Sequence, residues 1–568
     1  MLTRRDFLAS VGAASTISAS QAVAAPIRRK LKHRWVFIMS NLQTDSEVPR
    51  VESILRNAAA AGYNGVALSD WKSMVMDTAD SHYLPNLKQV IDTAKNLHLQ
   101  VIPLVCPIGS SESILEHNPN LAEGVPAKNV EYEVHNGVAT LVTTASLKLL
   151  NSKLIRANSN RFADWSYQDA PGQCTFQDTR ITREGNPSLR IDIDSAPSLI
   201  GTNARLYQKL TVQPYHQYRL SVWIKTDGFL GGDQVGAVTL DLKGNSLSWP
   251  QWDISTTQEW KKYQLILNSL NSTEITVILG VWGINGGKIW FNSPEFEEVG
   301  MLNLLRREGC PLTVLDDSGQ PLKEGVHFHP VIDSKMGNQP YSGCYDISHD
   351  GPQIILMPES KLINGSKLHV SFWHAIPVYS NSIPACITSP HVFSIMQNQI
   401  EDVVTKMHPQ GLFLSHDELR IINWCERCQN EHKTPGELLA ANVERCQTMC
   451  TKAAPNAFQC IWSDMFDPFH NAVNHYYLSN GSLQNSWRGL NKKTYIVNWN
   501  YGQRMKSMPW FASHGFRQIL AGYYDGSGNS IASWLEDAAH IQGIDGVMYT
   551  TWQNDYSALD AFAKSAWG

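Results

Sequence analysis

Carboxylate, amide and aromatic side chains follow several short apolar segments in the last third of the chain. Asp417 and Glu418 come directly after the apolar residues Gly411–Leu414, and Asp464 follows a segment that ends at Trp462. Three later apolar segments end in, or are followed by, further polar and aromatic residues, which are Asn498, Trp499 and Tyr501, then Asp525, and finally Trp552. Carboxyl groups surrounded by Trp and Tyr suit glycoside hydrolysis, because one carboxyl protonates the leaving oxygen while rings and amides hold the sugar.

Glu418 is the expected general acid, and Asp417 is its expected stabilising partner. Asp525 and Asp464 are alternative second carboxylates. A separation of about 5–5.5 Å from the acid would indicate a retaining enzyme and about 6.5–9.5 Å an inverting one. The adjacent pair could also be solvated loop charges or a salt-bridged helix N-terminus. A protein that binds glycans without cleaving them is a third hypothesis.

The elements that must position these residues are strands of a parallel sheet. Apolar segments alternate with amphipathic helical stretches at 51–61, 87–97 and 392–407, which is typical of repeated βα units. The eight expected strands are Trp35–Met39, Gly65–Leu68, Val101–Val105, Gly411–Leu414, Phe458–Trp462, Tyr495–Trp499, Gln518–Ala521 and Gly546–Thr550. Eight such units predict an α/β fold, a (β/α)8 TIM barrel, since the competing doubly wound sheet more usually has about five or six strands. Residues that follow barrel strands converge at the end where active sites lie.

The chain between the third and fourth expected strands has a different period. Alternation of apolar and outward-facing residues over 218–225 is the two-residue repeat of a half-buried strand. Further strands are expected at 189–193, 206–212, 263–267, 275–279 and 288–291. We therefore expect barrel segments at 26–125 and 377–568, with an all-β jelly-roll sandwich at 126–300 and a small β-rich connector at 301–376 between them.

The aromatic layout of this insertion resembles the jelly-roll carbohydrate-binding modules. The residues that carry the resemblance are Asn158, Phe162, Trp165, Gln213-Pro214-Tyr215, Tyr218, Trp260 and Trp290-Phe291. The resemblance implies glycan binding, and a structural lid without a sugar site is the alternative. Loops that leave the carboxyl ends of barrel strands border the active site, so the insertion is expected at the catalytic face.

The barrel half from about residue 410 onward resembles the family 20 glycoside hydrolases, the β-N-acetylhexosaminidases and their relatives. The motifs are Asp417-Glu418, Trp462-Ser463-Asp464, Asn498-Trp499-Asn500-Tyr501, the late Trp552 and the C-terminal stretch from Asp560 to Trp567. In that family the acetamide oxygen of the substrate is the nucleophile. The resemblance implies that Glu418 is the general acid/base, that Asp417 orients the acetamide and that Tyr501 hydrogen-bonds its oxygen. It also implies a pocket walled by Trp462, Trp499 and Trp552. The chain lacks the family's two glycines before Asp417, its sugar-binding Arg after the first strand and its Glu at 554, which here is Asn554.

Two close cysteine pairs follow the candidate acid. Cys425-x-x-Cys428 and Cys446-x-x-x-Cys450 have a spacing compatible with a structural zinc site. Disulfides would suit an exported protein, and Cys446 and Cys450 could instead be buried helix residues. The expected chemistry needs no metal or cofactor, and no Gly-rich phosphate loop is present.

The first 25 residues have the pattern of a twin-arginine signal peptide. Arg4 and Arg5 precede a mild apolar stretch over 8–25, and Ala22-Val23-Ala24 offers a cleavage site. The mature chain is therefore expected in the periplasm or outside the cell, with an oligo- or polysaccharide as its partner. No later segment approaches 18 unbroken apolar residues, so no membrane span is expected.

The overall composition narrows the class of protein. Across 568 residues, 47 Lys and Arg stand against 52 Asp and Glu, a net charge of −5. This balance argues against a dedicated nucleic-acid binder, which needs a basic surface. With 43% hydrophobic and 17% charged residues, wholesale disorder is excluded.

Overall fold

The structure is a computed structural model that describes residues 31–143, 147–158, 160–232, 234–379, 382–523, 525–526 and 530–568. The expected targeting segment at 1–25 lies outside the described residues. The chain divides into two compact units. One contains residues 1–123, 384–423 and 427–568, and the other contains 124–383 and 424–426. We call them the barrel unit and the inserted unit.

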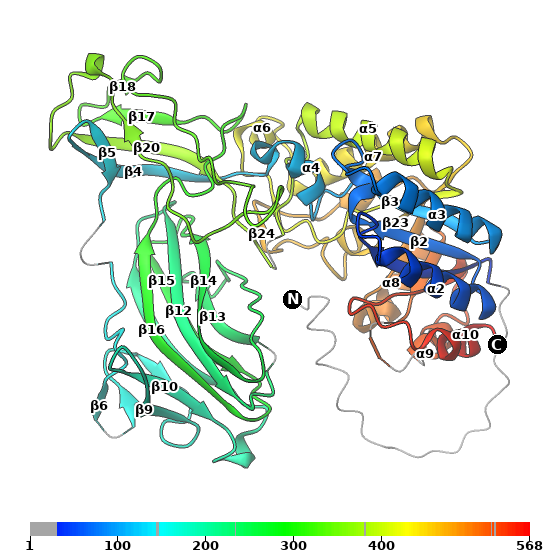
Figure 1. The fold of residues 1–568 in the computed structure, drawn as a ribbon, viewed down its shortest axis with the longest axis horizontal. Helices are drawn as coiled ribbons and strands as arrows, with labels where there is room; N and C mark the ends of the chain where they lie inside the picture. Colours follow the sequence, from blue (N-terminus) through cyan, green and yellow to red (C-terminus); the bar gives the residue numbers. More distant parts are fainter. Residues whose placement is uncertain are drawn as a thin grey trace. The chain divides into compact units, whose positions relative to one another are not determined.

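The barrel unit is built on eight strands that pair in parallel and close into a barrel (Figure 1). In barrel order they are β1 (His33–Ser40), β2 (Gly65–Asp70), β3 (Gln100–Val105), β21 (Gly411–Leu414), β23 (Phe458–Trp462), β25 (Tyr495–Asn498), β26 (Gln518–Ala521) and β27 (Ile544–Tyr549). The eight strands expected from the sequence all occur, with ends shifted by at most two residues. Their apolar runs are the local signal of parallel strands that are buried on both faces.

Helices follow most of the barrel strands. They are α2 (Glu47–Ala60), α3 (Tyr83–Asn96), α4 (Glu112–His117), α5 (Pro390–Met407), α6 (Glu426–Gln429), α7 (Pro435–Ala453), α8 (Arg504–Ser513), α9 (Ser530–Asp537) and α10 (Leu559–Ala566). A short 3-10 turn, η1 (Trp71–Met74), follows β2 directly. Helix α7 begins with a capping box, in which Thr434 and Glu437 exchange side-chain and backbone hydrogen bonds. Helices α2, α3, α5, α7, α8, α9 and α10 pack against barrel strands, while aromatic and aliphatic side chains fill the interior of the barrel.

The inserted unit contains the expected sandwich. One antiparallel sheet contains β14 (Gln258–Asn268), β12 (Gln217–Asp227), β16 (Lys288–Glu298), β10 (Asn186–Asp192) and β9 (Thr175–Arg183). The other contains β13 (Gln234–Leu240), β15 (Glu274–Trp282), β11 (Ala204–Thr211) and β8 (Tyr167–Gln168). Buried side chains such as Leu220 and Leu279 form one apolar core. A two-stranded ribbon of β6 (Arg156–Asn158) and β7 (Arg161–Phe162) lies in the same unit.

A third sheet in the inserted unit joins segments from both sides of the sandwich sequence. Its strands are β18 (Pro321–Leu322), β17 (Thr313–Asp316), β20 (Lys367–His374), β4 (Val125–His135), β5 (Val138–Leu141) and β19 (Ile354–Ile355). Residues 126–141 were expected in the sandwich, but β4 pairs along β20 instead. Nothing local in the sequence marks this pairing, because antiparallel partners here lie more than 200 residues apart.

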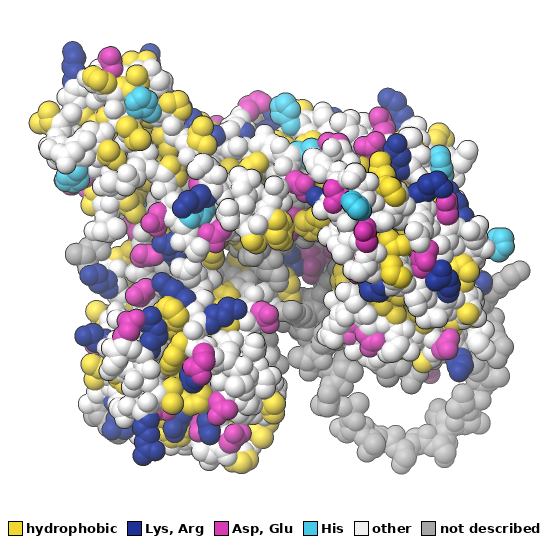
Figure 2. Space-filling model, in the orientation of Figure 1, with side chains coloured by type: hydrophobic (Ala, Val, Ile, Leu, Met, Phe, Trp, Pro, Cys, Tyr) yellow, Lys and Arg dark blue, Asp and Glu magenta, His cyan; other side chains and the backbone are white. Residues whose placement is uncertain are grey.

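Figure 2 shows acidic and basic side chains interspersed over the visible face of each unit. Within the described part of the chain, no helix has both the length and the apolar character that crossing a membrane requires.

Candidate active site

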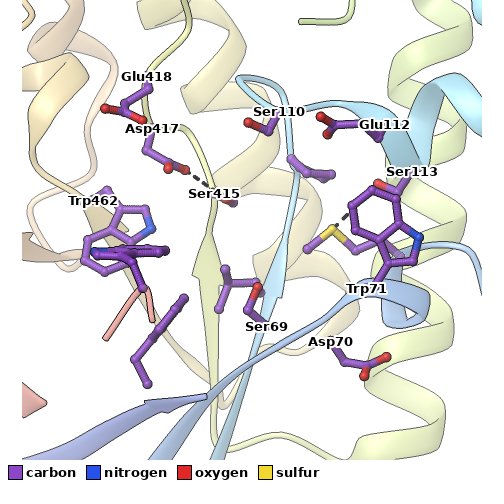
Figure 3. A pocket seen from close by; sticks show the side chains of 15 residues that line it. Ser69, Asp70, Trp71, Ser110, Glu112, Ser113, Ser415, Asp417, Glu418 and Trp462 are labelled. Atoms are coloured by element: carbon purple, nitrogen blue, oxygen red, sulfur yellow. Dashed lines mark hydrogen bonds between the residues drawn. The ribbon is translucent and has the colours of Figure 1, made fainter. Parts of the chain in front are cut away.

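A cavity of about 230 Å³ opens at the carboxyl ends of the barrel strands (Figure 3). Its lining residues are Phe37, Ser69, Asp70, Trp71, Met74, Leu104, Pro107, Ser110, Glu112, Ser113, Ser415, Asp417, Glu418, Trp462 and Trp552. Most of them lie in the segments that follow β2, β3 and β21, and Phe37 lies within β1. The sequence led us to expect the last five strands to supply the site, whereas β23 and the segment after β27 each contribute one residue and β25 and β26 none.

Asp417 and Glu418 lie on the segment that follows β21, on the same side of the cavity (Figure 3). The Ser415 hydroxyl donates to Asp417 Oδ1 at 2.9 Å. Glu418 Oε2 accepts a hydrogen bond from Arg420 Nη2 at 2.6 Å, and the two side chains are only 13% and 3% exposed. This shielded ion pair fixes the direction of the Glu418 side chain.

The Asp464 side chain accepts a hydrogen bond from the backbone of this segment and does not line the cavity. Its Oδ2 accepts from the Glu418 backbone N–H and from Asn471 Nδ2, both at 2.9 Å. Its Oδ1 accepts from Trp499 Nε1 at 3.1 Å. Glu418 has a left-handed backbone with φ of 51°, and the bond from its N–H to Asp464 helps to fix that conformation. Asp464 is therefore placed as a positioning residue.

The loop after β3 packs directly against the carboxylate segment. A Cβ built on Gly109 would lie 1.8 Å from the carbonyl oxygen of Asp417, so only glycine permits this approach. Three residues further along, Glu112 begins α4. The close packing brings Glu112 to the cavity from the side opposite Asp417 and Glu418, as Figure 3 shows.

Glu112 is a functional candidate that the sequence analysis missed. Burial raises the pKa of its carboxyl to about 7, although a backbone hydrogen bond and the charge of Arg420 act in the opposite direction. A carboxyl that keeps its proton near neutral pH can serve as a general acid. Its position in the loop after the third strand, seven residues beyond Val105, was a usable signal.

Aromatic rings form the walls of the cavity. Trp462 and Trp552 lie 6.3 Å apart between ring centroids, and Phe37 contacts both, at 5.7 and 5.3 Å. Trp71 is 36% exposed and offers a ring face near Glu112. The preceding Asp70 accepts hydrogen bonds from Ser40, Leu42 and Lys72, so it anchors the turn that carries Trp71.

Four more of the predicted site residues lie outside the cavity lining. Asn498 donates to Gln518 Oε1 at 2.5 Å within the barrel wall, and Trp499 is buried beside Asp464. The ring of Tyr501 packs under the Arg504 guanidinium at 3.6 Å. Asp525 Oδ2 accepts from the Trp552 backbone N–H at 2.9 Å, and Thr551 and Gln553 donate to its Oδ1. Asp525 therefore fixes the segment that carries Trp552.

The two cysteine pairs lie in different groups. Cys425 and Cys428 lie with Glu123 and Cys386 in one buried cluster. Cys446 and Cys450, one turn apart on α7, contact Cys106 instead, and hydrogen bonds to both thiols together with burial raise the pKa of Cys106. The single four-cysteine zinc site considered from the sequence is therefore not formed. In the structure none of the ten cysteines, all of which lie in the described residues, forms a disulfide.

Comparison with known proteins gives only distant similarities. No protein-family model and no curated protein matches this chain. A rhamnosidase from Novosphingobium sp. PP1Y aligns with 92% of this chain and 55% of its own at 8% identity, with a TM-score of 0.30. A beta-N-acetylhexosaminidase aligns with 34% of this chain and 45% of its own at 15% identity, with a TM-score of 0.26.

Several carbohydrate-binding modules resemble a smaller part of the chain. TmCBM61 in complex with beta-1,4-galactotriose aligns with 26% of this chain and 97% of its own at 15% identity, with a TM-score of 0.19. The solved structures that resemble this chain thus include glycosidases, of which it spans about half the length, and carbohydrate-binding modules. Since all these TM-scores are below 0.5, a function must be argued from the site itself.

Proposed function

We propose that this chain is an exported glycoside hydrolase with a (β/α)8 barrel that removes a terminal sugar from a complex glycan. The observation that carries the proposal is the pair of differently held carboxyl groups in one aromatic cavity. Glu112 retains its proton up to a pH of about 7, whereas Glu418 is ion-paired with Arg420. Two carboxyls with opposite protonation states are what glycoside hydrolysis requires. Export is inferred from Arg4-Arg5 and the apolar stretch after them.

The environments favour a division of roles that differs from the one expected from the sequence. Glu112 would donate its proton to the glycosidic oxygen as the bond to the leaving group breaks. Glu418, with Asp417 beside it, would stabilise the positive charge that develops at the anomeric carbon or attack that carbon directly. A carboxylate that is paired with a guanidinium is a poor proton donor, which is why we assign the acid role to Glu112.

The size of the cavity supports action at a chain end. Its volume of about 230 Å³ is below the roughly 300–1,000 Å³ typical of pockets for drug-sized ligands, which suits one sugar ring. The faces of Trp462 and Trp552 would stack on the C–H face of that ring. For an N-acetylhexosamine, the acetamide oxygen would be the nucleophile and Asp417 would orient it, as the family 20 resemblance implies.

Asp464 and Asp525 are weaker candidates for the second carboxylate. The oxygens of each accept hydrogen bonds from the protein, and neither residue lines the cavity. If the inserted sandwich binds sugars, it would hold the glycan substrate on the enzyme. A role in which both units only bind glycans is the remaining alternative.

The test is hydrolysis of aryl glycosides of N-acetylglucosamine, N-acetylgalactosamine, glucose, galactose and fucose by wild type and three variants. The variants are Glu112→Gln, Glu418→Gln and the exposed control Glu536→Gln. Each sugar is offered with a poor phenol and with an activated dinitrophenol leaving group. Loss of the acid should reduce turnover of the phenyl glycoside by about 10²–10⁴-fold and spare the dinitrophenyl glycoside, which leaves without protonation.

The outcomes separate the alternatives. If Glu112→Gln loses turnover of the phenyl glycoside but keeps turnover of the dinitrophenyl glycoside, Glu112 is supported as the acid. If only Glu418→Gln shows this difference, Glu418 is the acid, as the sequence predicted. Turnover restricted to N-acetylhexosaminides supports acetamide assistance. If no glycoside or natural oligosaccharide is cleaved while glycan binding is retained, the enzymatic proposal is wrong.

A further inference from the structure

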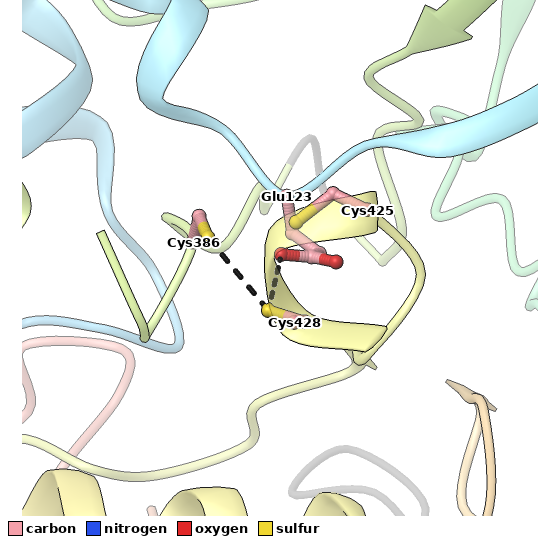
Figure 4. A group of neighbouring side chains, drawn as sticks. All are labelled: Glu123, Cys386, Cys425 and Cys428. Carbon is pink, nitrogen blue, oxygen red and sulfur yellow. Dashed lines mark hydrogen bonds between the residues drawn. The ribbon is translucent and has the colours of Figure 1, made fainter. Parts of the chain in front are cut away.

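We propose that Glu123, Cys386, Cys425 and Cys428 bind one structural zinc ion. This site is separate from the cavity and does not depend on the proposed hydrolase activity. The three sulfurs and one carboxylate oxygen all lie within 4.8 Å of one another (Figure 4), and all four residues are buried. Soft thiolates and a carboxylate in a small, closed group are ligands that zinc binds in structural sites.

Two distances within this cluster match the edges of a zinc tetrahedron. Tetrahedral Zn–S bonds of about 2.3 Å place two sulfurs about 3.8 Å apart, and a Zn–O bond of about 2.1 Å places sulfur and oxygen about 3.6 Å apart. Cys386 Sγ and Cys428 Sγ lie 3.7 Å apart, and Cys428 Sγ lies 3.6 Å from Glu123 Oε2. The sulfur–sulfur distance is far longer than the roughly 2.05 Å of a disulfide bond.

Two of the ligands are aligned by backbone pairing between distant segments. The Glu123 N–H donates to the Pro384 carbonyl at 2.8 Å, and the Cys386 N–H donates to the Leu121 carbonyl at 2.8 Å. Ala122 and Ala385 form the antiparallel bridge between these two bonds. The side chains of Glu123 and Cys386 are therefore placed together by the backbone before any metal binds, which lowers the cost of ordering the site.

The other two ligands come from one short turn, and a polar residue contacts the sulfurs. Cys425 immediately precedes α6 and Cys428 lies within it, the C-x-x-C spacing that lets both thiolates reach one ion. Thr388 Oγ1 lies 3.4 Å from Cys386 Sγ and 3.3 Å from Cys428 Sγ. Arg427 Nε donates to the Thr388 carbonyl at 3.0 Å. Such outer contacts orient ligands and offset thiolate charge in metal sites.

Binding would replace the three thiol protons with the ion. Zn²⁺ plus three thiols and one carboxylate gives the four-coordinate complex and three released protons, with no change of oxidation state. The ion would hold together three positions that are distant in the sequence, which are Glu123, Cys386 and the turn at 425–428. This turn belongs to the segment after β21 that also carries Glu418.

The test uses the full chain purified under reducing conditions without chelator. Elemental analysis should find one zinc per chain, and stepwise addition of a mercurial thiol reagent should release it. Replacement by Co²⁺ should give the thiolate charge-transfer band and the intense visible bands of tetrahedral cobalt. Glu123→Gln and Cys428→Ser should weaken retention against a metallochromic chelator by about tenfold or more, while the buried control Cys174→Ser should retain its zinc.

A misfolded variant would also lose zinc, so the mercurial release and the cobalt spectrum of wild type test the proposal independently of the variants. Absence of stoichiometric metal with all ten thiols reactive after unfolding would overturn the proposal. A disulfide between Cys386 and Cys428, found by mass spectrometry in protein purified under reducing conditions, would also overturn the proposal. So would full zinc retention in both Glu123→Gln and Cys428→Ser, because the ion would then lie elsewhere.

Discussion

Glu112 and Glu418 face one cavity, but the groups around them differ. Burial raises the pKa of Glu112 to about 7, whereas Arg420 lies 2.6 Å from Glu418. The same side-chain type can therefore hold a proton in one place and a negative charge in the other. Residue identity alone does not distinguish these states, because solvent exposure and neighbouring charge set them.

The pH dependence of catalysis should report the Glu112 proton. We expect kcat/KM of wild type to fall about tenfold per pH unit above a pH of about 7, because the acid form of Glu112 is the active form. In a pH–rate profile with the phenyl glycoside, wild type should show this alkaline limb, and the slow residual turnover of Glu112→Gln should lack it. An unchanged alkaline limb in the variant would contradict the assignment.

Stability should depend on the same group with a defined sign. The pKa of Glu112 rises from 4.5 to about 7 on folding, so the folded state binds more protons between these values. Its contribution to the free energy of unfolding is therefore present below about pH 4.5 and is lost as pH rises through about 7. Relative to wild type, Glu112→Gln should be more stable at high pH than at low pH in urea unfolding, and Glu536→Gln should show no such trend.

The Arg420 ion pair should matter more than an exposed pair. Arg420→Gln leaves Glu418 as an uncompensated charge in a largely buried position, which costs about 3–5 kcal/mol in comparable cases. Arg504→Gln breaks a more exposed pair with Asp537 and should cost about 0–1 kcal/mol. Urea unfolding at neutral pH measures both, and equal small losses would show that the Arg420 pair is not shielded.

At the scale of elements, the pattern of apolar residues predicted the barrel strands well, but it did not predict which loop residues line the cavity. β21, β23 and β26 have the bounds expected from their apolar runs, because burial on both faces leaves a continuous hydrophobic signal. Loop residues carry no such period. Asn498 ends β25 as Trp462 ends β23, and Tyr501 lies just beyond β25, yet Asn498 and Tyr501 contact neighbouring side chains and do not line the cavity.

A prediction at this scale concerns the contact between the loop after β3 and the segment after β21 that carries Asp417 and Glu418. Gly109→Ala places a Cβ 1.8 Å from the Asp417 carbonyl oxygen, so one backbone must move. We expect a loss of about 1–3 kcal/mol in unfolding free energy and a large fall in turnover. Gly526→Ala meets nothing within 4 Å and should leave both unchanged. Normal turnover in Gly109→Ala would show that this contact does not position Asp417.

At the scale of the whole molecule, each unit has its own apolar core. Chains with separate cores commonly unfold in more than one step. Leu220→Ala in the sandwich and Leu412→Ala in the barrel each remove a fully buried side chain, at a cost of about 2–5 kcal/mol. In calorimetry we expect two transitions, of which each variant lowers a different one. A single transition lowered by both variants would show that the units unfold together.

The sequence by itself determined the eight barrel strands, the β-rich insertion after the third strand, and the adjacent carboxylates at Asp417 and Glu418. These features depend on the local pattern of apolar and polar residues and on the order of segments along the chain, and both can be identified from neighbouring residues. Only the tertiary structure decided that Glu112 shares their cavity, that Asp464 supports Glu418 and that Cys428 lies beside Cys386 and Glu123. Each of these depends on which distant segments meet and on how much water they exclude, and neither property is encoded in a short stretch of residues.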